Sequence, residues 1–71
     1  METLIELIRN YVEADEITSD SDFRSDLGMN SFEIMCLITD IEVDFAVRLK
    51  PTDFVNYKTV GEMSDYIDSL K

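Results

Sequence analysis

The longest helical pattern in this 71-residue sequence runs from Ser31 to Phe45, and it limits how the rest of the chain can fold. Apolar residues recur in this stretch at spacings of three and four, as they do along one face of an amphipathic helix. A chain this short can build only a small core, so this helix must supply much of it. The face that we expect to be buried comprises Ile34, Leu37, Ile38, Ile41 and Phe45.

The opposite side of the same helix is also apolar. It comprises Phe32, Cys36, Thr39 and Val43, with Met35 beside them. Because a small bundle can fully bury only one side of a helix, we expect this second stripe to be exposed. An exposed apolar stripe among acidic residues is typical of a protein docking surface. A core wider than that of a small bundle is the alternative reading.

The start of this helix carries clear signals. Asn30 is a favourable N-cap residue, and Glu33 lies three residues on, as in a capping box. Gly28 suits a tight turn just before the helix. Ser31 is therefore expected at the helix N-terminus, where the backbone N–H groups and the macrodipole favour an anion such as a phosphate ester.

Three further helices are expected. The first runs from residue 3 to about residue 14, with Thr3 and Glu6 as a capping box. The preceding pattern ends at Lys50-Pro51, because the residue before a proline is disfavoured in a helix. A short helix is expected after it, from about residue 52 to residue 56. Its expected anchors are Phe54 and Val55.

The last helix begins at Thr59, with Glu62 completing another capping box. Its expected core stripe is Val60, Met63, Ile67 and Leu70. The long loop from 15 to 30 should be tied to the core by Ile17, Phe23 and Leu27. The predicted fold class is all-α: a small four-helix bundle of three longer helices and one short helix, with no internal linker.

The charge of the chain restricts its partners. Sixteen acidic and six basic residues give a formal net charge of -10, which argues against nucleic acid or an anionic membrane. No Lys or Arg occurs between Ser25 and Val47, although four acidic residues lie on the central helix: Glu33, Asp40, Glu42 and Asp44. We expect these acids to meet an electropositive protein surface. An ordinary solvated helix face is the alternative.

The sequence lacks the residues or spacings that hydrolase catalysis, an internal disulfide and an EF-hand require. The chain has no histidine, so Ser31 has no imidazole to activate it as a hydrolase nucleophile. Cys36 is the only cysteine, which excludes an internal disulfide, and we expect it to pack rather than react. Asp20, Asp22 and Asp26 do not fit the spacing of an EF-hand loop, so no metal site is expected. No signal peptide or membrane-spanning run is present in this sequence, and a cytoplasmic location is expected.

The segment from Asp26 to Ser31, Asp-Leu-Gly-Met-Asn-Ser, resembles the modification site of acyl carrier proteins. In that family the serine carries a 4′-phosphopantetheine arm, whose thiol holds an acyl group as a thioester. The resemblance also covers Phe23–Gly28, Asp40–Phe45 and the last helix from Thr59. It implies one acyl carrier domain over residues 1–71, with Ser31 as the attachment point and no catalysis by the chain itself.

The resemblance also implies partners for a monomeric carrier. A phosphopantetheinyl transferase would load Ser31. Enzymes of fatty-acid, polyketide or related specialised lipid biosynthesis would then dock through basic surfaces. The positions expected to meet them are Phe32, Glu33, Met35, Thr39, Asp40, Glu42 and Asp44.

The sequence departs from the family pattern around the serine. Asn30 stands where an aspartate is common, and Phe32 stands where leucine is usual. Val43 interrupts the acidic run, and Ala46 replaces a frequent glycine. These changes point to a specialised carrier. Two alternatives remain open: a peptidyl or aminoacyl carrier of the same fold, and an acidic interaction or inhibitor protein that works unmodified.

Overall fold

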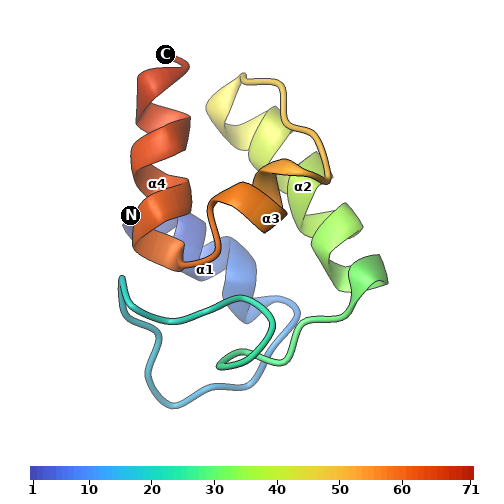
Figure 1. Cartoon of the computed structure of the whole chain (residues 1–71), viewed down its shortest axis with the longest axis vertical. Coiled ribbons are helices and arrows are strands. Elements are labelled where there is room, and N and C mark those ends of the chain that lie inside the picture. Colours follow the sequence, from blue (N-terminus) through green and yellow to red (C-terminus); the bar gives the residue numbers. More distant parts are fainter.

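The computed structural model describes all residues from 1 to 71 and contains four helices and no sheet. They are α1 (Glu2–Arg9), α2 (Ser31–Phe45), α3 (Asp53–Asn56) and α4 (Val60–Ser69). In Figure 1, α2 and α4 stand on opposite sides, α3 lies between them, and the long loop closes the lower end. Helix α1 contacts both α2 and α4. The predicted all-α bundle of three longer helices and one short helix is confirmed.

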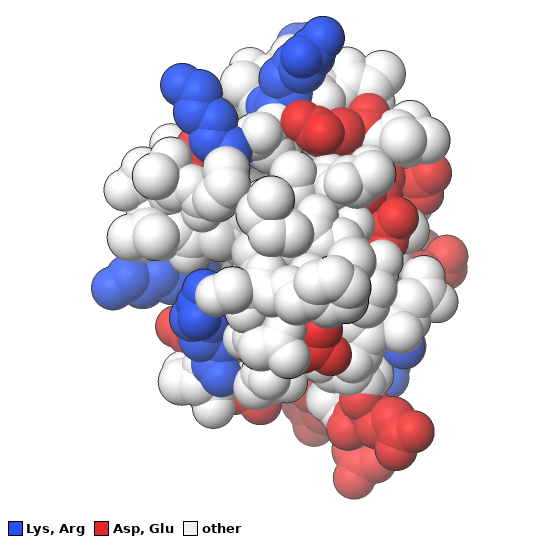
Figure 2. Space-filling model, turned by 90° about the vertical axis from the view of Figure 1, so that its right-hand side faces the viewer, with Lys and Arg blue, Asp and Glu red and all other residues white.

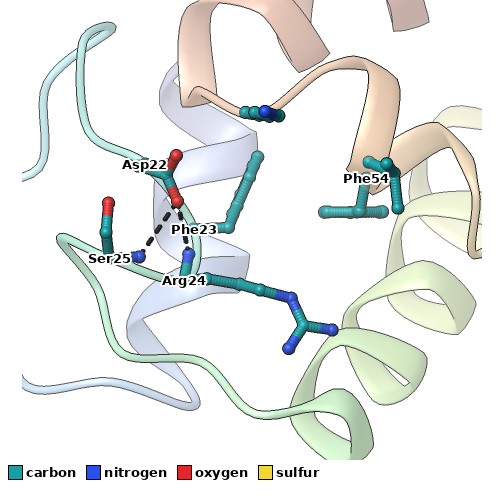
Figure 3. A pocket seen from close by; sticks show the side chains of 7 residues that line it. Asp22, Phe23, Arg24, Ser25 and Phe54 are labelled. Atoms are coloured by element: carbon teal, nitrogen blue, oxygen red, sulfur yellow. Dashed lines mark hydrogen bonds between the residues drawn. The ribbon is translucent and has the colours of Figure 1, made fainter.

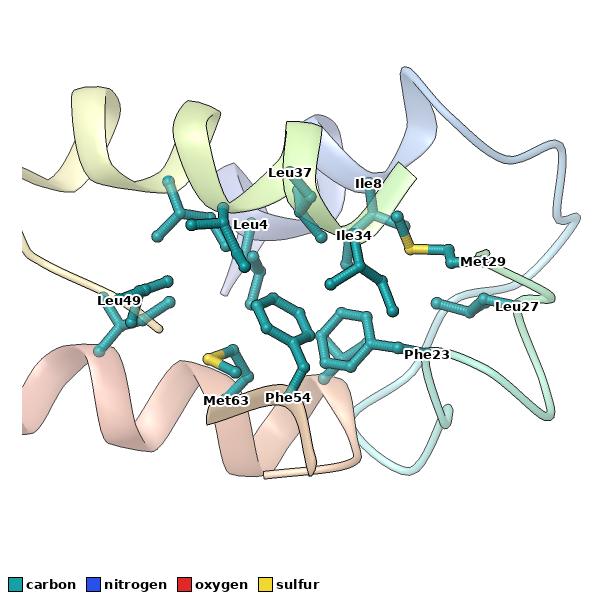
Figure 4. Close-up of a cluster of buried hydrophobic side chains, with 14 of the residues drawn as sticks. Leu4, Ile8, Phe23, Leu27, Met29, Ile34, Leu37, Leu49, Phe54 and Met63 are labelled. Atoms are coloured by element: carbon teal, nitrogen blue, oxygen red, sulfur yellow. The ribbon is translucent and has the colours of Figure 1, made fainter. Parts of the chain in front are cut away.

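The predicted inner face of α2 forms the centre of the core. Ile34, Leu37, Ile38 and Ile41 are buried, and Phe45 is partly buried at the edge of the cluster. Figure 4 shows Ile34 and Leu37 of this face among side chains from α1, α3, α4 and the loop. Because sixteen apolar residues from every element share this cluster, the helices are held together by one common core.

The second stripe of α2 lies on the surface. Phe32 and Val43 are 76% and 75% exposed, and Met35 is half exposed. Thr39 is exposed, while Cys36 is half-buried. The core is therefore no wider than a small bundle requires, and the prediction that this stripe is exposed is confirmed.

The long loop is attached to the first turn of α4 by backbone hydrogen bonds. The N–H groups of Val60 and Gly61 donate to the carbonyl oxygens of Ser21 (3.0 Å) and Ser19 (2.9 Å). The first N–H groups of a helix lack partners within the helix, and here the loop supplies them. A Cβ on Gly61 would lie 2.9 Å from the Cβ of Ser19, so the close approach requires glycine.

Apolar side chains of the loop complete this attachment. Ile17, Phe23 and Leu27 are buried as predicted, and Met29, which the sequence did not single out, is buried as well. The ring of Phe23 packs edge-on against that of Phe54, with centroids 4.9 Å apart and an interplanar angle of 67°. The loop is thus a packed layer of the domain.

The prediction for the first helix was wrong at both ends. Helix α1 stops at Arg9, and Met1 precedes it without a side-chain cap, so the expected capping box of Thr3 and Glu6 does not form. Contacts from elsewhere hold the next residues. Arg9 Nη1 donates to the carbonyl of Ala14 at 2.8 Å, and the Tyr11 hydroxyl donates to Asp40 on α2. One local bond and one tertiary bond thus hold the residues beyond Arg9, where the sequence pattern alone favoured more helix.

Two predicted anchors are also wrong. Val55 is 64% exposed, and Leu70 lies outside α4 and is exposed. In α3 the second buried residue is Asp53, whose carboxylate accepts a hydrogen bond of 2.8 Å from the backbone N–H of Lys50. A helix of four residues offers only one face to the core, so Phe54 fills it and Val55 points away.

The two faces of α2 predict opposite effects on stability. Ile38→Ala should lower the free energy of unfolding by about 2–5 kcal/mol, since it leaves a cavity in the core. Val43→Ala, and likewise Phe32→Ala, should change it by less than about 0.5 kcal/mol, because these side chains are exposed. Urea unfolding followed by circular dichroism measures all three. A loss at Val43 as large as that at Ile38 would contradict the assignment of the faces.

Candidate functional site

Ser31 is the first residue of α2, and its side chain is exposed. The predicted capping box fixes this start: the Glu33 N–H donates to Asn30 Oδ1 at 2.8 Å, and the Asn30 N–H donates to Glu33 Oε1 at 3.0 Å. Asparagine thus supplies the cap in full, although its side chain brings no charge to the position before the serine. The hydroxyl of Ser31 stands at the solvent-facing end of the helix.

Two aspartates shape the turn that leads to Ser31. The Asp22 carboxylate accepts from the N–H groups of Arg24 (2.8 Å) and Ser25 (3.0 Å), and Figure 3 shows both bonds. The Asp26 carboxylate accepts in return from the N–H of Asp22 at 2.7 Å. Asp26, the first residue of the motif, therefore holds its own loop in shape.

Glycine completes the turn. Gly28 has a φ of 66°, in the left-handed region, and its N–H donates to the Arg24 carbonyl at 3.0 Å. The Met29 N–H then donates to the carbonyl of Phe23, also at 3.0 Å. The buried residues Leu27 and Met29 on either side of Gly28 fix the turn to the core. The path from this turn into Ser31 is therefore well determined.

Arg24 brings a positive charge to the serine. Its Nη2 donates to Ser31 Oγ at 3.2 Å. Figure 3 shows its side chain leaving the loop and passing below Phe54 toward the start of α2. It lines a groove of about 330 Å³ between the loop and α3, together with Phe54, Val55 and Lys58. No motif in the sequence distinguishes Arg24, and its only signal is its place seven residues before Ser31.

Asp22, which also lines the groove, is stabilised in its charged form by its hydrogen bonds. The pKa of Asp22 is lowered, mainly by the backbone N–H of Ser25 and then by that of Arg24, with the charge of Lys58 adding to the effect. One carboxylate oxygen of Asp22 and one of Asp26 thus accept hydrogen bonds from the loop backbone.

Three of the four acids on α2 accept hydrogen bonds from the chain itself. Glu33 belongs to the capping box, and Glu42 Oε2 accepts from the Leu49 N–H at 2.9 Å. Asp40 accepts from the Tyr11 hydroxyl, and this bond is the main cause that raises the pKa of Tyr11 to about 12. Asp44 is exposed and makes no such bond. The expected partner-binding acids therefore differ in how freely a partner can use them.

The α2 side of the molecule presents a broad uncharged surface. In Figure 2, which views this side, most acidic groups lie along one edge and at the lower end, with a few at the top and below the centre, while most basic side chains lie toward the other edge and the top. The exposed apolar residues of α2 are Phe32, Met35 and Val43. An uncharged patch with a charged rim has the composition of a docking surface.

The structure shows no other reactive centre. No three Cys, Asp or Glu side chains come together as metal ligands, and every buried polar side-chain atom has a hydrogen-bond partner. None of the four helices has both the length and the apolar character needed to cross a bilayer. The candidate site for covalent modification is therefore the exposed hydroxyl of Ser31. It has the guanidinium of Arg24 beside it and a structured turn before it.

Comparison with known proteins identifies the family of the chain. The family model described as "Phosphopantetheine attachment site" matches residues 2–67. The acyl carrier protein of Exiguobacterium sibiricum is 40% identical over 57 residues, which is 80% of this chain and 72% of that protein. Phosphopantetheine is the cofactor that this family carries, and its members are carriers that catalyse no reaction themselves. The chain belongs to the phosphopantetheine-carrying family of acyl carrier proteins.

Proposed function

We propose that Ser31 carries the 4′-phosphopantetheine arm and that residues 1–71 act as one monomeric carrier domain in the cytoplasm. The observation that supports this assignment is the exposed Ser31 hydroxyl at the start of α2, within a chain whose family carries this group. The residues around Ser31 fit the phosphopantetheine arm. The hydroxyl is accessible, and the guanidinium of Arg24 lies within hydrogen-bond distance of it, where it can pair with an anion. When bound, the arm supplies a thiol that holds an acyl group as a thioester.

The chain's own contribution is to present this serine and to be recognised. The capping box and the Asp22–Asp26 turn hold the hydroxyl outward, where a transferase can reach it. The Oγ–phosphorus bond forms as the pyrophosphate bond of coenzyme A breaks, adenosine 3′,5′-bisphosphate leaves, and a base of the transferase takes the hydroxyl proton. Delivery then goes to enzymes of fatty-acid, polyketide or related lipid biosynthesis. Burial of Ser31 is not needed for such a role, since the chemistry takes place on the partner.

The proposed docking surface, which we call the outer α2 face, combines apolar contact with charge. Its apolar residues are Phe32, Met35, Thr39 and Val43. Among the acids, Asp44 is the free one, whereas Glu33, Asp40 and Glu42 already accept internal hydrogen bonds. A basic partner would therefore be steered by all four charges, but changing any of the three engaged acids would also disturb the fold.

Loading of Ser31 is the first test. Incubation with coenzyme A and a broad-specificity phosphopantetheinyl transferase should add the mass of one phosphopantetheine, as measured by intact-protein mass spectrometry. Ser31→Ala should stay unmodified, while Ser25→Ala, which changes an exposed serine of the same loop, should load like the parent. An unchanged parent mass would contradict the function and would favour an unmodified acidic interaction protein.

Charge reversal at Asp44 is the second test. Asp44→Lys should lower the kcat/KM of loading about threefold or more at low salt, because the opposite charge slows encounter with a basic enzyme. Asp65→Lys, an equal charge change at an exposed position of α4, is the matched control and should have a smaller effect. The two variants should converge as salt is raised, since screening removes long-range steering. Equal effects of the two reversals at every salt concentration would leave net charge as the only cause.

A further inference from the structure

We propose that the guanidinium of Arg24 pairs with the phosphodiester that joins the arm to Ser31, and so holds the root of the arm beside the groove between the loop and α3. This inference rests on the proposed function, because it requires Ser31 to be the attachment point. It assigns a binding role to a side chain outside the serine motif. The supporting observation is the 3.2 Å hydrogen bond from Arg24 Nη2 to Ser31 Oγ.

The backbone of Arg24 is fixed where this contact needs it. Its N–H donates to the Asp22 carboxylate at 2.8 Å, and its carbonyl accepts from the Gly28 N–H at 3.0 Å. The preceding residue, Phe23, is buried against Phe54. The side chain is exposed, yet it starts from a rigid point and reaches the serine without rearrangement of the loop.

The charges around Arg24 leave its guanidinium available for an anion. Two acids of the same loop, Asp22 and Asp26, each accept from backbone N–H groups through one carboxylate oxygen. The one side-chain hydrogen bond that the Arg24 guanidinium makes is to Ser31. Lys58 lines the same groove, but its charge acts on Asp22. No other Lys or Arg occurs between Ser25 and Val47, so Arg24 is the cation placed to meet a charge on Ser31.

The chemistry of the ester strengthens the contact that the free serine already makes. Esterified Oγ is a weaker acceptor than the free hydroxyl, but the phosphorus brings two non-bridging oxygens, two bonds from Oγ, that share one negative charge. A guanidinium matches such oxygens because its N–H groups form a planar fork. The contact therefore changes from a neutral acceptor to a charged one, and charge-assisted hydrogen bonds are the stronger kind.

A thermodynamic cycle tests the pairing. The melting temperatures of the unmodified and arm-bearing forms are measured for the parent, for Arg24→Gln and for Arg48→Gln. Attachment should raise the melting temperature about 2–5 °C more in the parent than in Arg24→Gln at low salt. Arg48→Gln loses the same charge beyond the far end of α2, about 20 Å from Ser31, and should behave like the parent. The difference should shrink at about 300 mM salt.

Magnetic resonance gives readouts that do not depend on stability. The ³¹P resonance of the arm-bearing protein should shift in Arg24→Gln and stay in place in Arg48→Gln. In the parent, which needs no substitution, the Arg24 Nε–H signal should move on attachment of the arm. Equal melting shifts in all three proteins, or an Arg24 signal indifferent to attachment, would overturn the pairing while the loaded mass still upheld Ser31 as the site. A parent that gains no arm would instead overturn the proposed function itself.

Discussion

The docking of the long loop onto the first turn of α4 is the interaction on which the site depends. Two backbone N–H groups that a helix start leaves unpaired, those of Val60 and Gly61, bond to loop carbonyls, and Phe23 enters the core behind them. Without this attachment the chain from 15 to 30 would be a long tether. With it, the turn before Ser31 becomes part of the folded domain, and the serine has a defined place.

Helix α2 divides the work of the molecule between its two faces. Its inner face, with Ile34, Leu37 and Ile41, holds the bundle together. Its outer face leaves Phe32 and Val43 exposed to solvent, and exposed apolar side chains of this kind suit contact with a partner. A carrier has to be recognised by several enzymes while staying folded. The proposed docking surface and the core share one helix that begins at Ser31, the proposed attachment point, and this arrangement suits both needs.

Much of the fold could be predicted from the sequence, because helix caps and the apolar spacing of a helix depend on residues that are close together in the chain. The caps at Asn30 and Thr59 formed as their capping-box patterns predicted, and the apolar spacing of α2 predicted which face is buried. The errors came from contacts between residues far apart in sequence. Tyr11, which the pattern placed in the first helix, lies beyond its end and bonds to Asp40, and only the folded loop brings Arg24 to Ser31. Likewise, the sequence shows four acidic residues on α2 but does not show which of them accept hydrogen bonds from other parts of the chain.

The central claim is that the loop is a fixed part of the domain and thereby presents Ser31. Hydrogen exchange of the backbone amides tests it most directly, because the N–H groups of Phe23, Val60 and Gly61 all bond across this junction. The account predicts that these three amides exchange about as slowly as the core amides of α2, in the protein with and without the arm. Exchange at the rate of an unstructured chain, while the α2 amides stay protected, would contradict it.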